Sequence, residues 1–75
     1  MKSMQISLQM ASQVKTFVSI VQKYPYDIEL HSGRYIVDAK SILGIFSLDL
    51  SKTLTIEIHS DDCDDLLNEL KQFSI

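Results

Sequence analysis

Only two side chains in this sequence carry an imidazole, a group that can accept a phosphoryl group or bind a metal. The imidazoles are His31, beside a predicted turn, and His59, at the end of a predicted strand. A neutral ring nitrogen can do either kind of chemistry. We interpret both histidines as ordinary surface or edge residues. As a metal pair they lack a convincing third ligand, although Asp61 and Asp62 follow His59 closely in sequence. The sequence therefore predicts no metal site and no cofactor.

Cys63 is the single cysteine, so it cannot form an internal disulfide. No second cysteine or histidine lies at a spacing typical of zinc ligands. We interpret its thiol as an inert, half-buried helix residue rather than a nucleophile. We interpret the surrounding acidic residues as stabilising the positive N-terminal end of a helix rather than as binding a cation. They are Asp61, Asp62, Asp64 and Asp65.

Length and composition predict one globular domain over residues 1–75. The chain is 45% hydrophobic, carries a formal net charge of −3 and has a pI near 5.1. Nucleic-acid binding is not expected, because it requires a basic stripe and none is found. There is no signal-peptide pattern and no run of about 18 apolar residues, the length that spans a membrane. We expect a soluble cytoplasmic protein without membrane contact.

The elements that must position these side chains follow from hydrophobic periodicity. Residues 2–8 alternate apolar and polar, which predicts a half-buried strand. The next apolar residues recur at helical spacing and stop before Pro25, which predicts a helix; they are Val14, Phe17, Val18, Val21 and Tyr24.

The rest of the chain continues the alternation of strands and helices. A hairpin is predicted over 27–31 and 34–38, then a short helix capped by Ser41, and a strand over 53–58. A last helix is predicted to begin at residues 60–62. The order βαββαβα indicates an α+β fold, with a four-stranded antiparallel sheet covered on one face by three helices.

This order, with the sequence KSILG at residues 40–44, resembles the HPr family. These are small phosphocarrier proteins of the bacterial sugar phosphotransferase system, with an open-faced β-sandwich fold. The family's pattern around its regulatory serine is Lys, Ser, two aliphatic residues and Gly, which places that serine at Ser41. Asp38 departs from the asparagine usual in the family.

At the active site the resemblance is incomplete. The family's pattern is Gly, an aliphatic residue, His, Ala, Arg and Pro. An ungapped alignment places Met10 at the histidine position, Ser12 at the arginine position and Gln13 at the proline position. A thioether cannot accept a phosphoryl group, and a phosphoserine ester at Ser12 would be too stable to pass its phosphate on. We therefore predict that the chain is not an enzyme and does not relay phosphate at Met10.

Ser41 has two compatible roles. As an N-cap it would accept a backbone hydrogen bond, worth about 1 kcal/mol. The resemblance implies a second role as the target of a dedicated serine kinase. A phosphate there would meet free backbone amides and a favourable helix dipole.

A docking surface is also predicted. Five apolar residues in a helix of barely two turns exceed what one buried stripe requires. The resemblance implies that this aliphatic patch and the start of the first helix bind partner proteins together. The predicted docking surface comprises Met10, Ala11, Ser12, Lys15, Ile42, Leu43 and Phe46.

The leading hypothesis is a non-catalytic regulatory or binding protein that is switched by phosphorylation at Ser41. Its closest parallel would be the HPr-like proteins of catabolite repression, which lack the phosphocarrier histidine. Its expected partners are proteins such as a serine kinase or a transcription regulator, and it would be a monomer or weak dimer. The alternatives are a divergent phosphocarrier that uses His31 or His59, and a purely structural or assembly role.

Overall fold

A four-stranded antiparallel sheet forms one layer of the molecule. The computed structural model describes residues 1–75 and contains strands β1 (Lys2–Ile6), β2 (Ile28–Ser32), β3 (Tyr35–Asp38) and β4 (Leu54–Ile58). The strand order is β1-β4-β2-β3, with every neighbouring pair antiparallel. In the two central strands, alternate side chains are buried, so one face packs on the core and the other is open to solvent.

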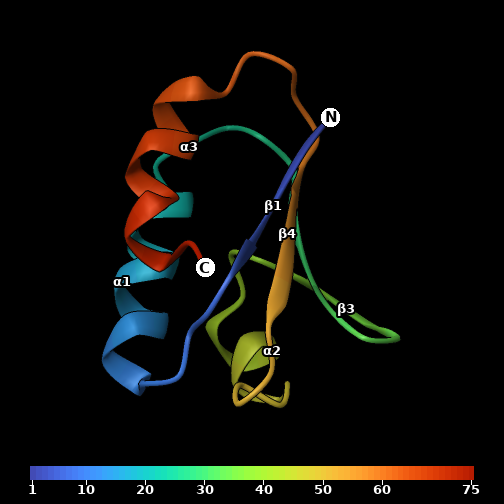
Figure 1. Ribbon diagram of the computed structural model, residues 1–75. Coiled ribbons are helices and arrows are strands. Elements are labelled where there is room, and N and C mark those ends of the chain that lie inside the picture. Colours follow the sequence, from blue (N-terminus) through green and yellow to red (C-terminus); the bar gives the residue numbers. More distant parts are fainter.

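The helices cover the buried face of this sheet (Figure 1). They are α1 (Ala11–Val21), α2 (Ile42–Phe46) and α3 (Asp64–Leu70), and α3 continues into the short 3₁₀ helix η1 (Lys71–Phe73). The predicted α+β architecture and the order βαββαβα are confirmed. No helix is long and apolar enough to cross a bilayer.

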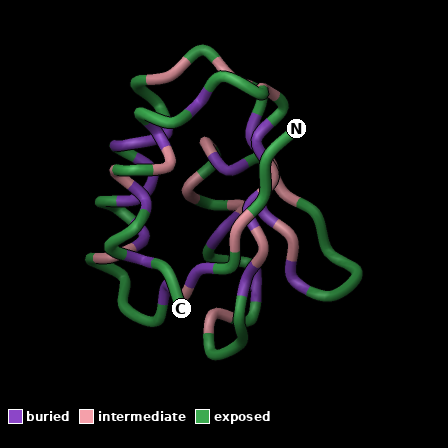
Figure 2. The backbone as a smooth tube through the Cα atoms, turned by 45° about the horizontal axis from the view of Figure 1, so that its top comes forward, coloured by how far each residue is buried: buried purple, intermediate pink, exposed green.

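The hydrophobic core lies between the helices and the sheet. Buried and partly exposed residues alternate along the central strands β2 and β4, and buried residues recur at helical spacing along α1 (Figure 2). The rings of Phe17 and Phe73 meet edge to face, with centroids 5.8 Å apart, and join α1 to the C-terminal segment. Other fully buried side chains are Ile6, Leu8, Leu30, Ile45, Leu54, Ile56, Ile58, Leu66 and Leu70.

The hairpin between β2 and β3 forms as predicted. Ser32 is directly opposite Tyr35, and Gly33 in the turn has a φ of +59°. Only glycine adopts such a backbone conformation without strain. The turn fixes the register of β3 on β2 and therefore the residues that share the open face.

The start of the last helix was predicted too early. Ser60 does not cap a helix, because its hydroxyl accepts a hydrogen bond from the amide of Asp62 in the preceding turn. The N-cap of α3 is Cys63, whose side chain is fully buried rather than half-buried. Burial also raises the pKa of this thiol, which agrees with an inert cysteine. Asp64 and Asp65 do lie in the first turn.

Candidate functional site

The junction between β1 and α1 places Met10 at the N-cap of α1. Its backbone is extended, with a φ of −114° and a ψ of 145°, and its thioether makes no capping hydrogen bond. The side chain is 62% exposed, whereas Leu8, two residues earlier, is completely buried. Leu8 therefore anchors the junction in the core while Met10 projects towards solvent.

Gln13 supplies the hydrogen bonds that Met10 does not. Its Oε1 accepts from the backbone amides of Gln9, at 3.0 Å, and Met10, at 3.1 Å. A side-chain acceptor three residues into the helix thus satisfies donors at the N-terminus. These two amides bind a neutral carboxamide oxygen of the chain itself, and no imidazole is present to accept phosphate.

At the start of α2, Ser41 is an N-cap as predicted. Its Oγ accepts a hydrogen bond from the amide of Gly44 at 3.3 Å, and the residue is exposed. A Cβ at position 44 would lie only 3.3 Å from that Oγ and 3.4 Å from the Cβ of Val37. The glycine thus leaves room for the capping serine against β3.

Two hydrogen bonds fix the start of α2 beside the end of α1. The Nζ of Lys40 donates to the carbonyl of Tyr24 at 2.7 Å, and Nε2 of Gln22 donates to the carbonyl of Lys40 at 3.3 Å. The Lys40 amide donates to Oδ1 of Asp38 at 2.9 Å. Ser41 is therefore held on a defined turn, with one basic and one acidic residue close to it in sequence.

The predicted docking surface is exposed except at one residue. Leu43 is 80% exposed and Phe46 42%, although both are apolar. Ala11, Ser12 and Lys15 are exposed on α1. The starts of α1 and α2 lie towards the same end of the molecule (Figure 1).

Ile42 departs from the prediction for this surface. It is only partly exposed and packs against the hydrophobic core. The reason is geometric, because Ile42 lies three residues before the fully buried Ile45 and so faces the same side of the helix. The exposed apolar part of α2 is therefore Leu43 and Phe46.

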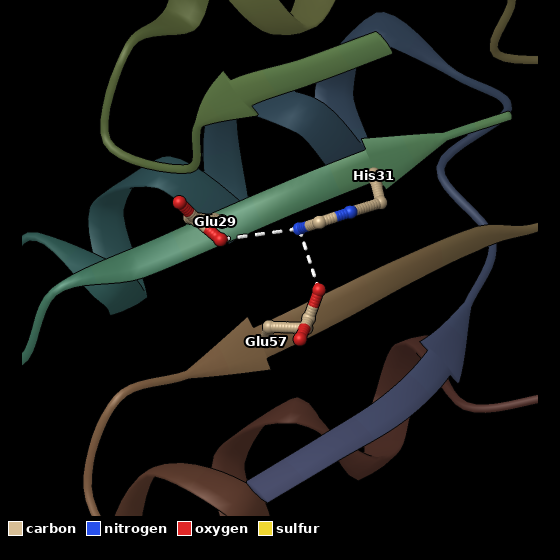
Figure 3. A group of neighbouring side chains, drawn as sticks. All are labelled: Glu29, His31 and Glu57. Atoms are coloured by element: carbon tan, nitrogen blue, oxygen red, sulfur yellow. Dashed lines mark hydrogen bonds and ion pairs between the residues drawn. The ribbon is translucent and has the colours of Figure 1, made fainter. Parts of the chain in front are cut away.

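Both histidines, which the sequence analysis interprets as surface or edge residues, lie beside glutamates of the sheet. His31 Nε2 lies 2.6 Å from Glu57 Oε2 and 3.2 Å from Glu29 Oε1 (Figure 3). His59 Nε2 lies 3.3 Å from the same Glu29 oxygen. The neighbours of the imidazoles are thus glutamates brought together by strand pairing, rather than Asp61 and Asp62, which follow His59 in sequence. We call these four residues, Glu29, His31, Glu57 and His59, the open-face cluster.

A repeated tripeptide was the sequence signal for this cluster. Glu-x-His occurs at residues 29–31 and again at 57–59. Residues two apart on a strand share a face. Two such tripeptides on neighbouring strands can therefore bring two carboxylates and two imidazoles together.

Comparison with known proteins places this geometry in a family. A family model described as the PTS HPr component phosphorylation site matches residues 9–74, which include Met10, Ser41 and almost the whole fold. The chain belongs to the PTS HPr family. HPr proteins are phosphocarriers rather than enzymes themselves. No curated protein matches the sequence significantly.

Solved HPr structures share the fold closely. HPr-C-His from Thermoanaerobacter tengcongensis is 26% identical, with a TM-score of 0.81 over 96% of this chain and 89% of that one. The phosphocarrier protein HPr from Bacillus anthracis is 28% identical, with a TM-score of 0.73 over 99% and 94%.

The catabolite repression protein Crh of Bacillus subtilis is also similar. It is 26% identical to this chain, with a TM-score of 0.67 over 91% of this chain and 79% of that one. The expected HPr-like fold is thus confirmed by phosphocarriers and by a catabolite repression protein alike.

Proposed function

We propose that this chain is a regulatory or binding member of the HPr family that does not relay phosphate at the start of α1. The observation that carries the proposal is Met10 at the N-cap, where the family resemblance places histidine. Phosphoryl relay needs a nucleophilic ring nitrogen and donors that stabilise the transferred charge. Here the position holds a thioether, and Ser12 stands where the family has arginine.

The docking surface supports a binding role in the cytoplasm. Leu43 and Phe46 are among the large hydrophobic residues that remain exposed, and they lie three residues apart on the same helix, α2. Exposed apolar side chains on a rigid, capped helix are typical of a protein-binding surface. Lys15 adds one positive charge from α1. The expected partner is a protein that offers an apolar pocket, such as a serine kinase or a transcription regulator.

Ser41 is the proposed switch of this surface. It is exposed, and it precedes Leu43 by only two residues. A phosphate at this position would bring negative charge next to the apolar contact and the first amides of α2. Phosphorylation would therefore change which partner binds without unfolding the helix.

A relocated phosphocarrier histidine is less compatible with the geometry. His31 Nε2 lies within 3.2 Å of carboxylate oxygens from both Glu29 and Glu57. His59 Nε2 lies 3.3 Å from Glu29 Oε1. A transferred phosphoryl group is strongly negative, so carboxylates at these distances would oppose it.

The first test is incubation of the chain with phosphoenolpyruvate and the first enzyme of the phosphotransferase system. Intact mass should show no acid-labile phosphate, while an HPr protein in the same reaction should gain one. An acid-labile phosphate on this chain would overturn the proposal, and its loss in His31→Gln or His59→Gln would identify the acceptor.

The second test uses an HPr serine kinase and ATP. The native chain should gain one phosphate, and Ser41→Ala should gain none. Phe46→Asp should be phosphorylated more slowly, because the kinase would dock on α2. Ile75→Asp is the matched control, since it places the same charge at an exposed apolar residue of the C-terminus.

Equal phosphorylation of Phe46→Asp and Ile75→Asp would reject the docking surface. No phosphate on the native chain would reject Ser41 as a switch. Sedimentation of the native chain distinguishes a structural or assembly role from a regulatory one. An assembly role would require that the native chain self-associates and that Phe46→Asp abolishes this self-association.

A further inference from the structure

The open face of the sheet carries an unusual row of like charges. Glu29 on β2 is directly opposite Glu57 on β4 and, on its other side, directly opposite Asp38 on β3. Like charges directly opposite one another destabilise a sheet. Three carboxylates in a row across neighbouring strands therefore create a negative site that a cation would stabilise.

The imidazoles flank this row in a nearly symmetric way. His31 follows Glu29 by two residues on β2, and His59 follows Glu57 by two residues at the end of β4. Because β2 and β4 are antiparallel, each histidine lies diagonally beside the glutamate of the other strand. The observed pairs are His31 with Glu57 and His59 with Glu29.

The distances suit one small metal ion. Ligand atoms from Glu29, His31 and Glu57 all lie within 4.8 Å of one another. Ligands about 2.1 Å from a tetrahedral zinc ion lie about 3.4 Å from one another. His31 Nε2 is already 3.2 Å from Glu29 Oε1, whereas its 2.6 Å separation from Glu57 Oε2 would have to widen by about 0.8 Å.

We propose that this face of the sheet binds a divalent transition-metal ion such as zinc through His31 Nε2 and carboxylate oxygens of Glu29 and Glu57. The two carboxylates balance the charge of the ion, and a neutral imidazole supplies the nitrogen ligand that favours zinc over magnesium or calcium. Solvent would fill the remaining position.

His59 acts as a positioning residue in this site. Its Nε2 lies 3.3 Å from Glu29 Oε1, the same oxygen that lies 3.2 Å from His31 Nε2, and this contact restrains the carboxylate. The pKa of Glu29 is lowered, chiefly by its hydrogen bond with His31 and then by that with His59.

Burial and backbone support the site as well. The side chains of His31 and Glu57 are 23% and 26% exposed, so their rotamers are constrained by their neighbours. Both ligating elements are central strands rather than loops, which holds the ligands in place. Glu29, His31 and Glu57 alternate with fully or nearly fully buried residues along β2 and β4, so the site lies on the face of the sheet opposite the core.

The test is calorimetric titration of zinc chloride into the chain, purified without a polyhistidine tag. One ion should bind per chain, and zinc should raise the melting temperature because it binds the folded state. Magnesium chloride should give no comparable heat. His31→Gln and Glu57→Gln should each weaken zinc binding by about 100-fold, and His59→Gln by about tenfold.

Asp38→Asn is the matched control. Like Glu57, Asp38 is directly opposite Glu29, and its substitution removes one negative charge from the same row. It should change zinc affinity by less than about threefold, because it supplies no ligand. Circular dichroism checks that each variant is folded. If His31→Gln does not fold, the zinc affinity of Glu57→Gln decides the result.

Two results would overturn the site: no zinc binding to the native chain, or equal affinities of Glu57→Gln and Asp38→Asn. The second result would mean that zinc is attracted by general negative charge rather than held by these ligands. Equal binding of magnesium would overturn the choice of a transition metal.

Discussion

The two helix N-termini, at Met10 and at Ser41, solve the same structural problem with different chemistry. Each helix leaves backbone amides without partners in its first turn. At α2 the cap is the N-cap hydroxyl itself, because Ser41 Oγ accepts from Gly44. At α1 the side chain of the N-cap Met10 makes no capping hydrogen bond, and Gln13 accepts from two amides of the junction instead.

The difference separates what the fold requires from what phosphate transfer requires. The acceptor at a helix N-terminus can be a hydroxyl, as at Ser41, or a carboxamide, as at Gln13. A phosphocarrier needs a nitrogen nucleophile at one position, and no other group of the fold replaces it. The start of α1 is therefore a folded helix N-terminus without a nitrogen nucleophile, while the start of α2 presents a serine hydroxyl.

The largest effect should come from returning an imidazole to α1. Met10→His/Ser12→Arg should accept an acid-labile phosphate from phosphoenolpyruvate and the first enzyme of the system, whereas the native chain should accept none. The reason is that the exposed N-cap already projects towards solvent beside a helix N-terminus. Intact mass before and after acid treatment measures the change. Met10→Gln/Ser12→Arg is the control, and an unphosphorylated histidine variant would contradict the prediction.

A second comparison divides α2 into a buried and an exposed half. Ile45→Ala should lower the free energy of unfolding by about 3 kcal/mol, because this side chain is fully buried. Leu43→Ala should change it by less than about 0.5 kcal/mol, since Leu43 is 80% exposed. Urea denaturation measures both values. Similar losses would mean that Leu43 contributes to the core and is not available for docking.

The cap of α2 should contribute less than its core anchor. Ser41→Ala should lower the free energy of unfolding by about 1 kcal/mol, because the amide of Gly44 loses its acceptor. Urea denaturation again measures the loss, and Ser41→Asp should restore part of it through the same hydrogen bond. An Ser41→Asp variant that is less stable than Ser41→Ala would argue that α2 does not tolerate negative charge at its start.

The smallest effect is expected at the cap of α1. Gln13→Ala should change the free energy of unfolding by less than about 0.5 kcal/mol, because water can replace an exposed carboxamide and alanine favours the helix. Hydrogen exchange of the Gln9 and Met10 amides should nevertheless accelerate, since both lose their acceptor. Unchanged exchange at these amides would show that Gln13 does not cap α1 in solution.

Much of the fold was predictable because its elements have strong periodicity. Alternation in residues 53–58 and helical spacing from Val14 to Val21 are confirmed as β4 and α1. The predicted start of α3 was wrong because the hydroxyl of Ser60 can accept a backbone hydrogen bond in either of two local structures. These are a helix N-cap and a turn. The turn forms here, and the buried Cys63 that follows it is the N-cap of α3 instead.

The sequence by itself determined the strands, the helices, the capping role of Ser41 and the absence of histidine at the start of α1. These depend on contacts between residues a few positions apart, which periodicity and residue type describe well. Tertiary structure alone decided the outward face of α2 and the meeting of His31 with Glu57. Both depend on the register of strands far apart in sequence and on which side of each element the core occupies.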